Sequence, residues 1–328
     1  MSEQRRRKLG RSGIEVSAVG FGCWAIGGPF TAGGKPAGWG AVDDDESIAA
    51  VHRALELGVT FFDTANVYGT GHSERLLGRA LAGHRDDIVV ATKFGNTFDP
   101  GTRELTGTDV SPDYVRSACD GSLARLGTDR IDLYQLHVGD LPLDWVDDLL
   151  GTLESLVDAG KIRAYGWSTD DPARAAAFAA GEHCAAVQHQ LNVLDDAPEM
   201  LVVCAEQDLA SINRGPLAMG LLSGKYSAET TLGPDDVRGD SPDWMRYFTD
   251  GRPDPAWLNR VAAIRDVLTD DGRTLAQGAL GWILARHGST VPIPGCRTVA
   301  QVEDNAGVLA AGPLKPAAMA EIAGLLCD

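Results

Sequence analysis

The stretch GVTFFDTANVYG at residues 58–69 contains the pattern on which the fold prediction depends. Gly58 ends a helical segment, and a short run of β-branched and aromatic residues follows at residues 59–63. An apolar run of this length, bounded by glycine and closed by a polar residue, is typical of a buried parallel strand. The pattern therefore places Asp63 at the end of a strand and Tyr68 in the loop after it.

The same alternation of a short strand and a longer amphipathic helix continues along the chain. Helices are predicted at residues 45–57, 73–81, 112–126 and 143–159, and Ser111 before Pro112 is a typical helix start. Strands are predicted at residues 17–22, 59–63, 88–92, 131–137, 164–168, 186–190, 209–213 and 291–293. Eight strands alternating with helices indicate the α/β class and a (β/α)8 TIM barrel.

Three further features complete the predicted architecture. Residues 8–16 are predicted to form an N-terminal hairpin that plugs the bottom of the barrel. The irregular stretch at residues 227–254 follows the seventh strand and is predicted to overhang the C-terminal end of the barrel. Residues 1–328 are predicted to form a single barrel domain, because α/β barrels often have this length.

The composition restricts location and partners. The chain has 29 lysines and arginines against 46 aspartates and glutamates, a net charge of −17, so its surface should repel nucleic acid and anionic membranes. Residues 2–8 are basic but lack the apolar segment of a signal peptide, and no run approaches the ~20 apolar residues of a membrane span. Six cysteines without a CxxC pair indicate reduced thiols. We expect a cytoplasmic protein; a homo-oligomer is compatible with the sequence, but nothing indicates one.

Four polar residues follow consecutive predicted strands and can perform one reaction together. Carbonyl reduction needs a hydride on carbon and a proton on oxygen, and a tyrosine with its usual pKa of about 10 is a weak acid. A Lys93 ammonium would lower the pKa of Tyr68, and Asp63 would keep Lys93 charged. His137 is suited to orient the carbonyl oxygen. Each residue alone has a structural explanation, but the set predicts reduction with Tyr68 as proton donor.

The stretch GVTFFDTANVYG at residues 58–69, together with SERLLG at residues 73–78, resembles the signature of the aldo-keto reductase family, in its bacterial-type branch. The resemblance continues through GWS at residues 166–168, PL at 216–217, LLSGK at 221–225 and PGCR at 294–297. It implies that the catalytic tetrad of the family falls on Asp63, Tyr68, Lys93 and His137. It also implies reduction of aldehydes and ketones by NADPH, which leaves NADP+.

The resemblance implies an NADP(H) molecule extended across the barrel mouth, without a Rossmann domain. Two positions depart from the family: Thr169 replaces a frequent asparagine, and Arg214 replaces a tyrosine and would face the nicotinamide. Arg297, at the expected start of the last barrel helix, would bind the 2′-phosphate together with backbone amides. The full implied cofactor set is Trp24, Ser168, Thr169, Gln188, Arg214, Pro216, Leu217, Gly220, Ser223, Lys225, Gly295, Cys296, Arg297, Gln301 and Asn305.

Aromatic residues in the loops should form the walls of the substrate site. Trp24, Phe30 and Trp39 follow the first strand, and the long loop adds Trp244, Tyr247 and Phe248 as further candidates. Walls of this kind suit small carbonyl compounds.

Three alternatives compete with a reductase. An NADP(H)-binding subunit could report redox state with slow turnover, since the intact tetrad does not exclude this role. A metal-dependent hydrolase could use Asp63, His137 and Asp140, but Lys93 would repel the cation, and no metal site is predicted. The GxGxxA pattern at residues 20–25 matches a dinucleotide fingerprint, but Gly27, Gly28 and Pro29 do not allow the required helix.

Overall fold

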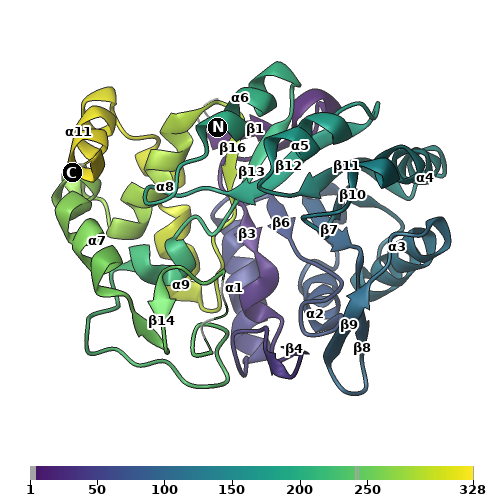
Figure 1. Ribbon diagram of the computed structural model, residues 1–328, viewed down its shortest axis with the longest axis horizontal. Coiled ribbons are helices and arrows are strands. Elements are labelled where there is room, and N and C mark those ends of the chain that lie inside the picture. The colour runs from purple at the N-terminus through teal and green to yellow at the C-terminus, as the bar shows by residue number, and fades with distance from the viewer. Residues whose placement is uncertain (1–4, 241, 243, 328) are drawn as a thin grey trace.

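The computed structural model describes residues 5–240, 242 and 244–327, and its centre is a sheet of eight parallel strands (Figure 1). The order in the sheet is β3-β6-β7-β10-β11-β12-β13-β16, which follows the chain. The bounds of these strands are β3 Phe21–Gly22, β6 Phe61–Asp63, β7 Val89–Phe94, β10 Ile131–Leu136, β11 Ile162–Ser168, β12 Cys184–Gln190, β13 Ala210–Arg214 and β16 Thr290–Pro292.

Backbone contacts between the first and last strands close the sheet into a barrel. The amide of Gly20 donates to the carbonyl of Pro292 at 2.9 Å, and the amide of Gly22 donates to that of Pro294 at 3.0 Å. Gly22 also forms a parallel bridge with Gly295. A Cβ on Gly22 would lie 2.6 Å from the carbonyl oxygen of Ile293, so the closure requires glycine here. The (β/α)8 barrel prediction is confirmed.

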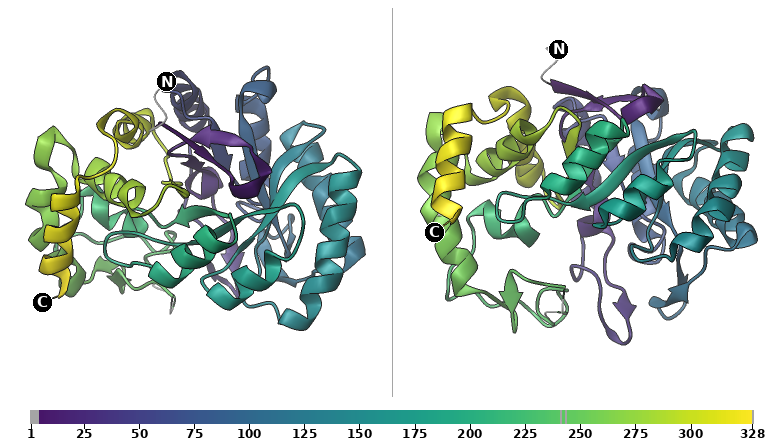
Figure 2. Two further views of the ribbon diagram at one scale, coloured as in Figure 1. Left: turned by 90° about the horizontal axis from the view of Figure 1, so that it is seen from above. Right: turned by 45° about the horizontal axis from the view of Figure 1, so that its top comes forward.

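The amino-terminal hairpin covers the bottom of the barrel (Figure 2). β1 (Arg6–Lys8) pairs antiparallel with β2 (Glu15–Ser17). Leu9, Ile14 and Val16 are buried in one apolar cluster with strand residues such as Phe61. The hairpin prediction is confirmed, whereas the predicted strand at 17–22 is wrong in its first part, because Ser17 pairs within the hairpin. Residues 2–4 of the basic amino-terminal stretch lie outside the described residues.

Helices surround the barrel and begin at capping residues that the sequence supplies. Asp43 caps α1, and Ser111 caps α3 with Pro112 in the first turn. No helix of the described chain combines the length and apolar character needed to cross a bilayer. The α-helices are α1 Asp44–Glu56, α2 His72–Ala80, α3 Pro112–Leu126, α4 Val146–Asp158, α5 Pro172–Phe178, α6 Pro198–Glu206, α7 Pro255–Leu268, α8 Leu275–Arg286, α9 Val299–Ala306, α10 Val308–Ala311 and α11 Pro316–Cys327.

Loops at the C-terminal end of the barrel build structure that the sequence analysis did not predict. The loops after β3 and β7 combine into a four-stranded sheet of order β5-β4-β9-β8, at Lys35–Pro36, Thr31–Ala32, Glu104–Thr108 and Asn96–Asp99. The long loop after β13 contains the small hairpin of β14 (Phe248–Thr249) and β15 (Arg252–Pro253). Both features stand at the end of the barrel where the strands finish.

Candidate active site

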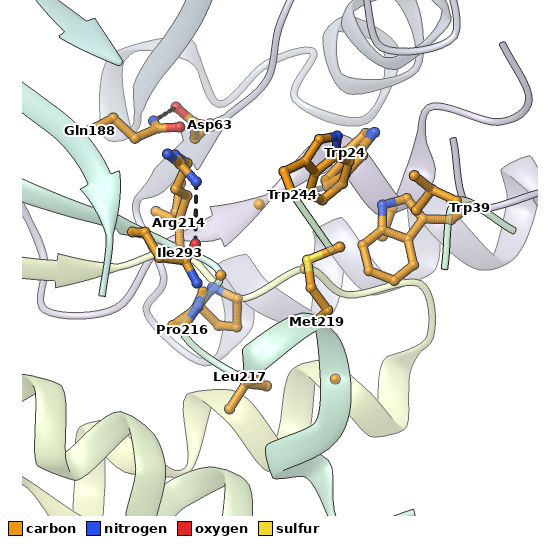
Figure 3. Close-up of a pocket in the computed structure, with 18 of the residues that line it drawn as sticks. Trp24, Trp39, Asp63, Gln188, Arg214, Pro216, Leu217, Met219, Trp244 and Ile293 are labelled. Atoms are coloured by element: carbon orange, nitrogen blue, oxygen red, sulfur yellow. Dashed lines mark hydrogen bonds between the residues drawn. The ribbon is translucent and has the colours of Figure 1, made fainter. Parts of the chain in front are cut away.

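A cavity of about 1690 Å³ opens at the C-terminal ends of the barrel strands. Asp63, Tyr68 and His137 line it, and the loop at 227–254 contributes part of its wall, as predicted. Figure 3 shows Trp24, Trp39 and Trp244 on one side of this cavity, and Arg214 and Pro216 on the other. Barrel enzymes carry their chemistry at this end of the strands.

The ends of β6 and β7 bring Asp63, Lys93 and Tyr68 together. The Lys93 Nζ donates to Asp63 Oδ1 at 2.5 Å, to the carbonyl of Thr64 at 2.9 Å and to the Tyr68 hydroxyl at 3.2 Å. The next residue, Gly69, has a φ of +58°, and a Cβ there would lie 1.7 Å from the carbonyl oxygen of Gly27. This close approach fixes the loop that carries Tyr68.

Burial and charge act in opposite directions on Tyr68 and Lys93. Burial raises the pKa of the Tyr68 hydroxyl, Lys93 lowers it, and the net pKa lies above the usual value. The prediction that Lys93 lowers this pKa is right in direction, but a net lowering is wrong because burial outweighs the ammonium. For Lys93, burial lowers the pKa, but Asp63 and Tyr68 raise it by more than burial lowers it. The net pKa lies above the usual value, so the ammonium remains charged.

Two glutamine amides hold the second oxygen of Asp63. Gln135 Nε2 donates to Asp63 Oδ2 at 2.9 Å. Gln188 Nε2 donates to the same oxygen at 2.8 Å, the bond drawn in Figure 3. Gln188 also donates to Gln135 Oε1 at 3.2 Å. The sequence analysis assigned Gln188 only to the cofactor and missed Gln135. Gln135 lies two residues before His137, which directly follows β10, and that alternation was a usable signal.

His137 is partly buried beside the tyrosine. Its ring meets the Tyr68 ring edge-to-face, with centroids 5.9 Å apart. Burial lowers its pKa well below the usual range, and the positive charges of Lys93 and Arg214 lower it further. Its Nδ1 has no hydrogen-bond partner among the described residues. The imidazole is therefore neutral and can donate one hydrogen bond.

Most of the residues assigned to the cofactor line the cavity, but two do not. Thr169 is buried, and its hydroxyl donates to the carbonyl of Gly139 at 2.8 Å instead. Cys296 is also buried, and it accepts a hydrogen bond from Asn305 Nδ2 at 3.2 Å. The cavity is lined by Trp24, Ser168, Gln188, Arg214, Pro216, Leu217, Gly220, Ser223, Lys225, Gly295, Arg297, Gln301 and Asn305.

Arg214 ends β13 and has protein partners within the cavity wall. Its guanidinium pairs with the Asp170 carboxylate and donates to Gln190 Oε1 at 3.2 Å. Asp170, which the sequence analysis did not select, also lines the cavity. The pairing places a compensated cation, rather than an isolated one, at the nicotinamide end that the resemblance implies.

The position of Arg297 corrects one prediction. It precedes Thr298, which caps α9 by accepting from the amide of Gln301, so Arg297 is not within the helix. α9 is the helix after the eighth barrel strand, as predicted, and α10 and α11 follow it. The guanidinium donates to the carbonyls of Trp39 and Ala41 in the loop after β3.

Arg238 is a cavity residue that the sequence analysis missed. It is 6% exposed, pairs with Asp236 at 2.6 Å and donates to the carbonyl of Met219 at 3.0 Å. A Cβ on Gly220 would lie 3.3 Å from its guanidinium, so it borders the segment assigned to the pyrophosphate. One arginine in a polar loop gave no periodic signal that could have singled it out.

The predicted aromatic walls are largely in place. Trp24, Phe30, Trp39, Trp244 and Tyr247 line the cavity. Phe248 is buried and packs edge-to-face against Tyr226, so it does not form part of the wall. Within the described residues, no three His, Cys, Asp or Glu side chains gather as a possible metal site.

Fold and site together define a class of protein. An eight-stranded barrel whose mouth joins a tyrosine, a buried lysine–aspartate pair and a neutral histidine has the constellation of the aldo-keto reductases. The model of the Aldo/keto reductase family matches residues 18–326, and the chain belongs to this family.

Individual relatives cover nearly the whole chain. The aldo-keto reductase yakc [NADP(+)] of Schizosaccharomyces pombe is 33% identical over 314 residues, 92% of this chain and 86% of that protein. The solved glycerol dehydrogenase AKR11B4 from Gluconobacter oxydans is 29% identical, with a TM-score of 0.83 over 100% of this chain and 96% of that one. An aldo/keto reductase from Klebsiella pneumoniae, solved with NADP and acetate, is 26% identical, with a TM-score of 0.69 over 98% of this chain and 95% of that one.

Proposed function

We propose that residues 1–328 work as one domain, an NADP(H)-dependent oxidoreductase that reduces aldehyde and ketone carbonyls to alcohols. The observation that carries the proposal is the Tyr68 hydroxyl, which lies in the cavity 3.2 Å from a Lys93 ammonium bound to Asp63. This arrangement supplies a proton donor and a fixed positive charge at one point of a mostly apolar cavity.

The cavity has the size and the donors that a phosphorylated dinucleotide requires. Its 1690 Å³ exceeds the roughly 300–1,000 Å³ of typical small-ligand pockets, so a cofactor and a substrate can share it. Lys225, Arg238 and Arg297 supply positive charge along one wall. Ser168 and Gln188 would hold the nicotinamide amide, and Gln301 and Asn305 the adenosine end. Bound NADPH supplies the hydride.

Each member of the tetrad has a separate task. Tyr68 gives its proton to the carbonyl oxygen, and the Lys93 ammonium stabilises the phenolate that remains. Asp63 holds Lys93, and Gln135 and Gln188 hold Asp63. Neutral His137 donates a hydrogen bond to the carbonyl oxygen and thereby turns it toward Tyr68.

The relatives support the cofactor assignment. The fission yeast relative is named for NADP(+), and the Klebsiella pneumoniae structure contains NADP. We further propose a cytoplasmic location, a small carbonyl substrate and no need for nucleic acid or membrane. The net charge of −17 and the free cysteines favour these assignments.

A panel of aldehydes and ketones, with NADPH absorbance followed in time, tests the proposal. We expect saturable NADPH consumption with at least one substrate and formation of the matching alcohol. Tight NADPH binding, seen by fluorescence, without turnover of any panel member would contradict catalysis and favour the regulatory alternative.

A further inference from the structure

Trp24, Trp39 and Trp244 form one connected aromatic surface, which we call the tryptophan wall. The Trp24 ring is the centre of this surface. Its centroid lies 5.2 Å from that of Trp39 and 6.2 Å from that of Trp244. Trp24 also stacks on the Tyr68 ring, with centroids 6.1 Å apart and planes inclined by 24°. The wall therefore extends from the proposed proton donor to the cavity entrance.

The three rings differ in how firmly they are held. Trp24 Nε1 donates to the carbonyl of Ala37 at 3.0 Å, and Trp39 carries the Arg238 guanidinium 4.5 Å from its ring centroid. Trp244 belongs to the long loop and is 56% exposed, although it lines the cavity. Exposing so much of a large aromatic ring is unfavourable, and a flat apolar ligand would remove that area from water.

The charges near the wall are compensated. Lys35 pairs with Asp240 at 3.2 Å, Arg214 pairs with Asp170, and Arg246 pairs with Asp195. A substrate carboxylate would have to displace one of these protein carboxylates. Among the described residues, Lys225 and Arg297 have no carboxylate partner, but both are assigned to the cofactor phosphates under the proposed function, so the remaining described cations of the cavity offer a substrate anion no vacant partner.

We propose that Trp244 determines substrate specificity, and that the preferred substrates are uncharged carbonyl compounds with an aromatic ring. The ring lies against Trp244, and the carbonyl points to Tyr68 and His137. This inference rests on the proposed function, because it concerns the substrate of the same site. The reaction adds a hydride from NADPH to the carbonyl carbon and the Tyr68 proton to the oxygen, giving the alcohol and NADP+.

The test compares Trp244→Ala with Trp145→Ala. Trp145 is 52% exposed and is absent from the cavity lining, so it controls for loss of an exposed tryptophan. Substrates are methyl 4-formylbenzoate, its anionic counterpart 4-formylbenzoate, and propanal. For wild type, we expect kcat/KM to be highest for the neutral aromatic aldehyde and at least about 10-fold lower for the anion.

For Trp244→Ala, we expect KM for methyl 4-formylbenzoate to rise roughly 2- to 13-fold, the worth of an aromatic contact. The kcat for both substrates, and KM for propanal, should stay within about 2-fold of the wild-type values. Trp244→Phe should recover most of the loss in KM for methyl 4-formylbenzoate. Trp145→Ala should match wild type. The proposal would be overturned if Trp244→Ala lost as much kcat/KM with propanal as with methyl 4-formylbenzoate. It would also be overturned if wild type reduced 4-formylbenzoate with the same kcat/KM as its methyl ester.

A binding measurement separates this inference from the proposed function. Methyl benzoate has the ring without the aldehyde, and calorimetry can follow its binding to the NADP+-loaded protein. We expect Trp244→Ala to weaken this binding and Trp145→Ala to leave it unchanged. If no aldehyde is reduced, the proposed function fails, but this binding difference would still support the tryptophan wall. If small aldehydes are reduced and both variants bind methyl benzoate equally, only the wall proposal fails.

Discussion

The two ends of the cavity are built differently. At the catalytic end, Lys93 is fully buried and its ammonium already bonds to Asp63 and Tyr68. At the proposed adenosine end, the Arg297 guanidinium bonds to the backbone carbonyls of Trp39 and Ala41. The first end is preorganised, whereas under the proposed function the second would have to exchange protein partners for a phosphate. Substitutions at the first end should therefore change rates, and those at the second should change affinities.

The largest effect is expected for Tyr68→Phe, which removes the proton donor and leaves the ring. General acid catalysis contributes about 10²–10⁴-fold, so we expect a loss of at least about 10²-fold in the reduction step. NADPH binding, measured by fluorescence, should be retained. Tyr134→Phe is the matched control, because Tyr134 is fully buried and its hydroxyl has no hydrogen-bond partner among the described residues. Near-native turnover of Tyr68→Phe would remove Tyr68 from the mechanism.

Lys93→Met tests whether Lys93 sets the pKa of Tyr68, the proton donor at the catalytic end. Reduction needs protonated Tyr68, so the rate falls as pH rises through the pKa of that hydroxyl. Burial raises this pKa and Lys93 lowers it, so removal of Lys93 should slow turnover and move the alkaline limb to higher pH. Because the pKa of His137 lies well below its usual range, we expect no loss of rate from its protonation between pH 8 and pH 6.

The substitution needs a control for folding, because Lys93→Met leaves the Asp63 carboxylate buried without its cation. Breaking a buried ion pair in this way destabilises the fold by about 3–5 kcal/mol. The double variant Asp63→Asn/Lys93→Met removes both charges and should regain stability while keeping the shifted limb. An unchanged limb in single-turnover measurements would show that Lys93 does not set the pKa of Tyr68.

The difference between the ends also explains what the sequence could predict. The tetrad follows from strand ends, since parallel strands bring Asp63, Lys93 and His137 to one level whatever the loops do. The bonds of Arg297 to Trp39 and Ala41 join residues more than 250 positions apart. The four-stranded sheet also pairs two separate loops, at Thr31 with Glu104. No local pattern encodes such pairings, because they depend on how loops settle on the finished barrel.

Arg297→Ala tests the adenosine end. A charge-assisted hydrogen bond is worth about 1.5–3 kcal/mol, or roughly 10–150-fold in affinity, so NADPH binding should weaken by that factor. Binding of NADH, which lacks the 2′-phosphate, should barely change, and wild type should prefer NADPH by at least about 10-fold. Equal losses for both cofactors would mean that Arg297 acts only by holding Trp39 and Ala41. A wild type that prefers NADH would show that the adenosine site is wrongly assigned.

The smallest effect is expected at Glu46, which faces the start of α9. The Glu46 carboxylate accepts a hydrogen bond from the amide of Val299, the first residue of that helix, at 3.2 Å. A phosphate bound beside Arg297 would compete for this helix terminus, where one negative charge is worth about 0.3–1 kcal/mol. We therefore expect Glu46→Gln to strengthen NADPH binding roughly 2- to 5-fold, without changing NADH binding.

Glu303→Gln is the matched control for this last prediction. Glu303 lies on the same helix, but its carboxylate pairs with Arg53 at 2.8 Å, away from the helix start. Its removal should change the affinity for neither cofactor, so a gain confined to Glu46→Gln would show direct competition for the α9 terminus. If Glu46→Gln weakens NADPH binding instead, the carboxylate supports α9 rather than competing with the cofactor. In that case, the adenosine end would be preorganised in the same sense as the catalytic end.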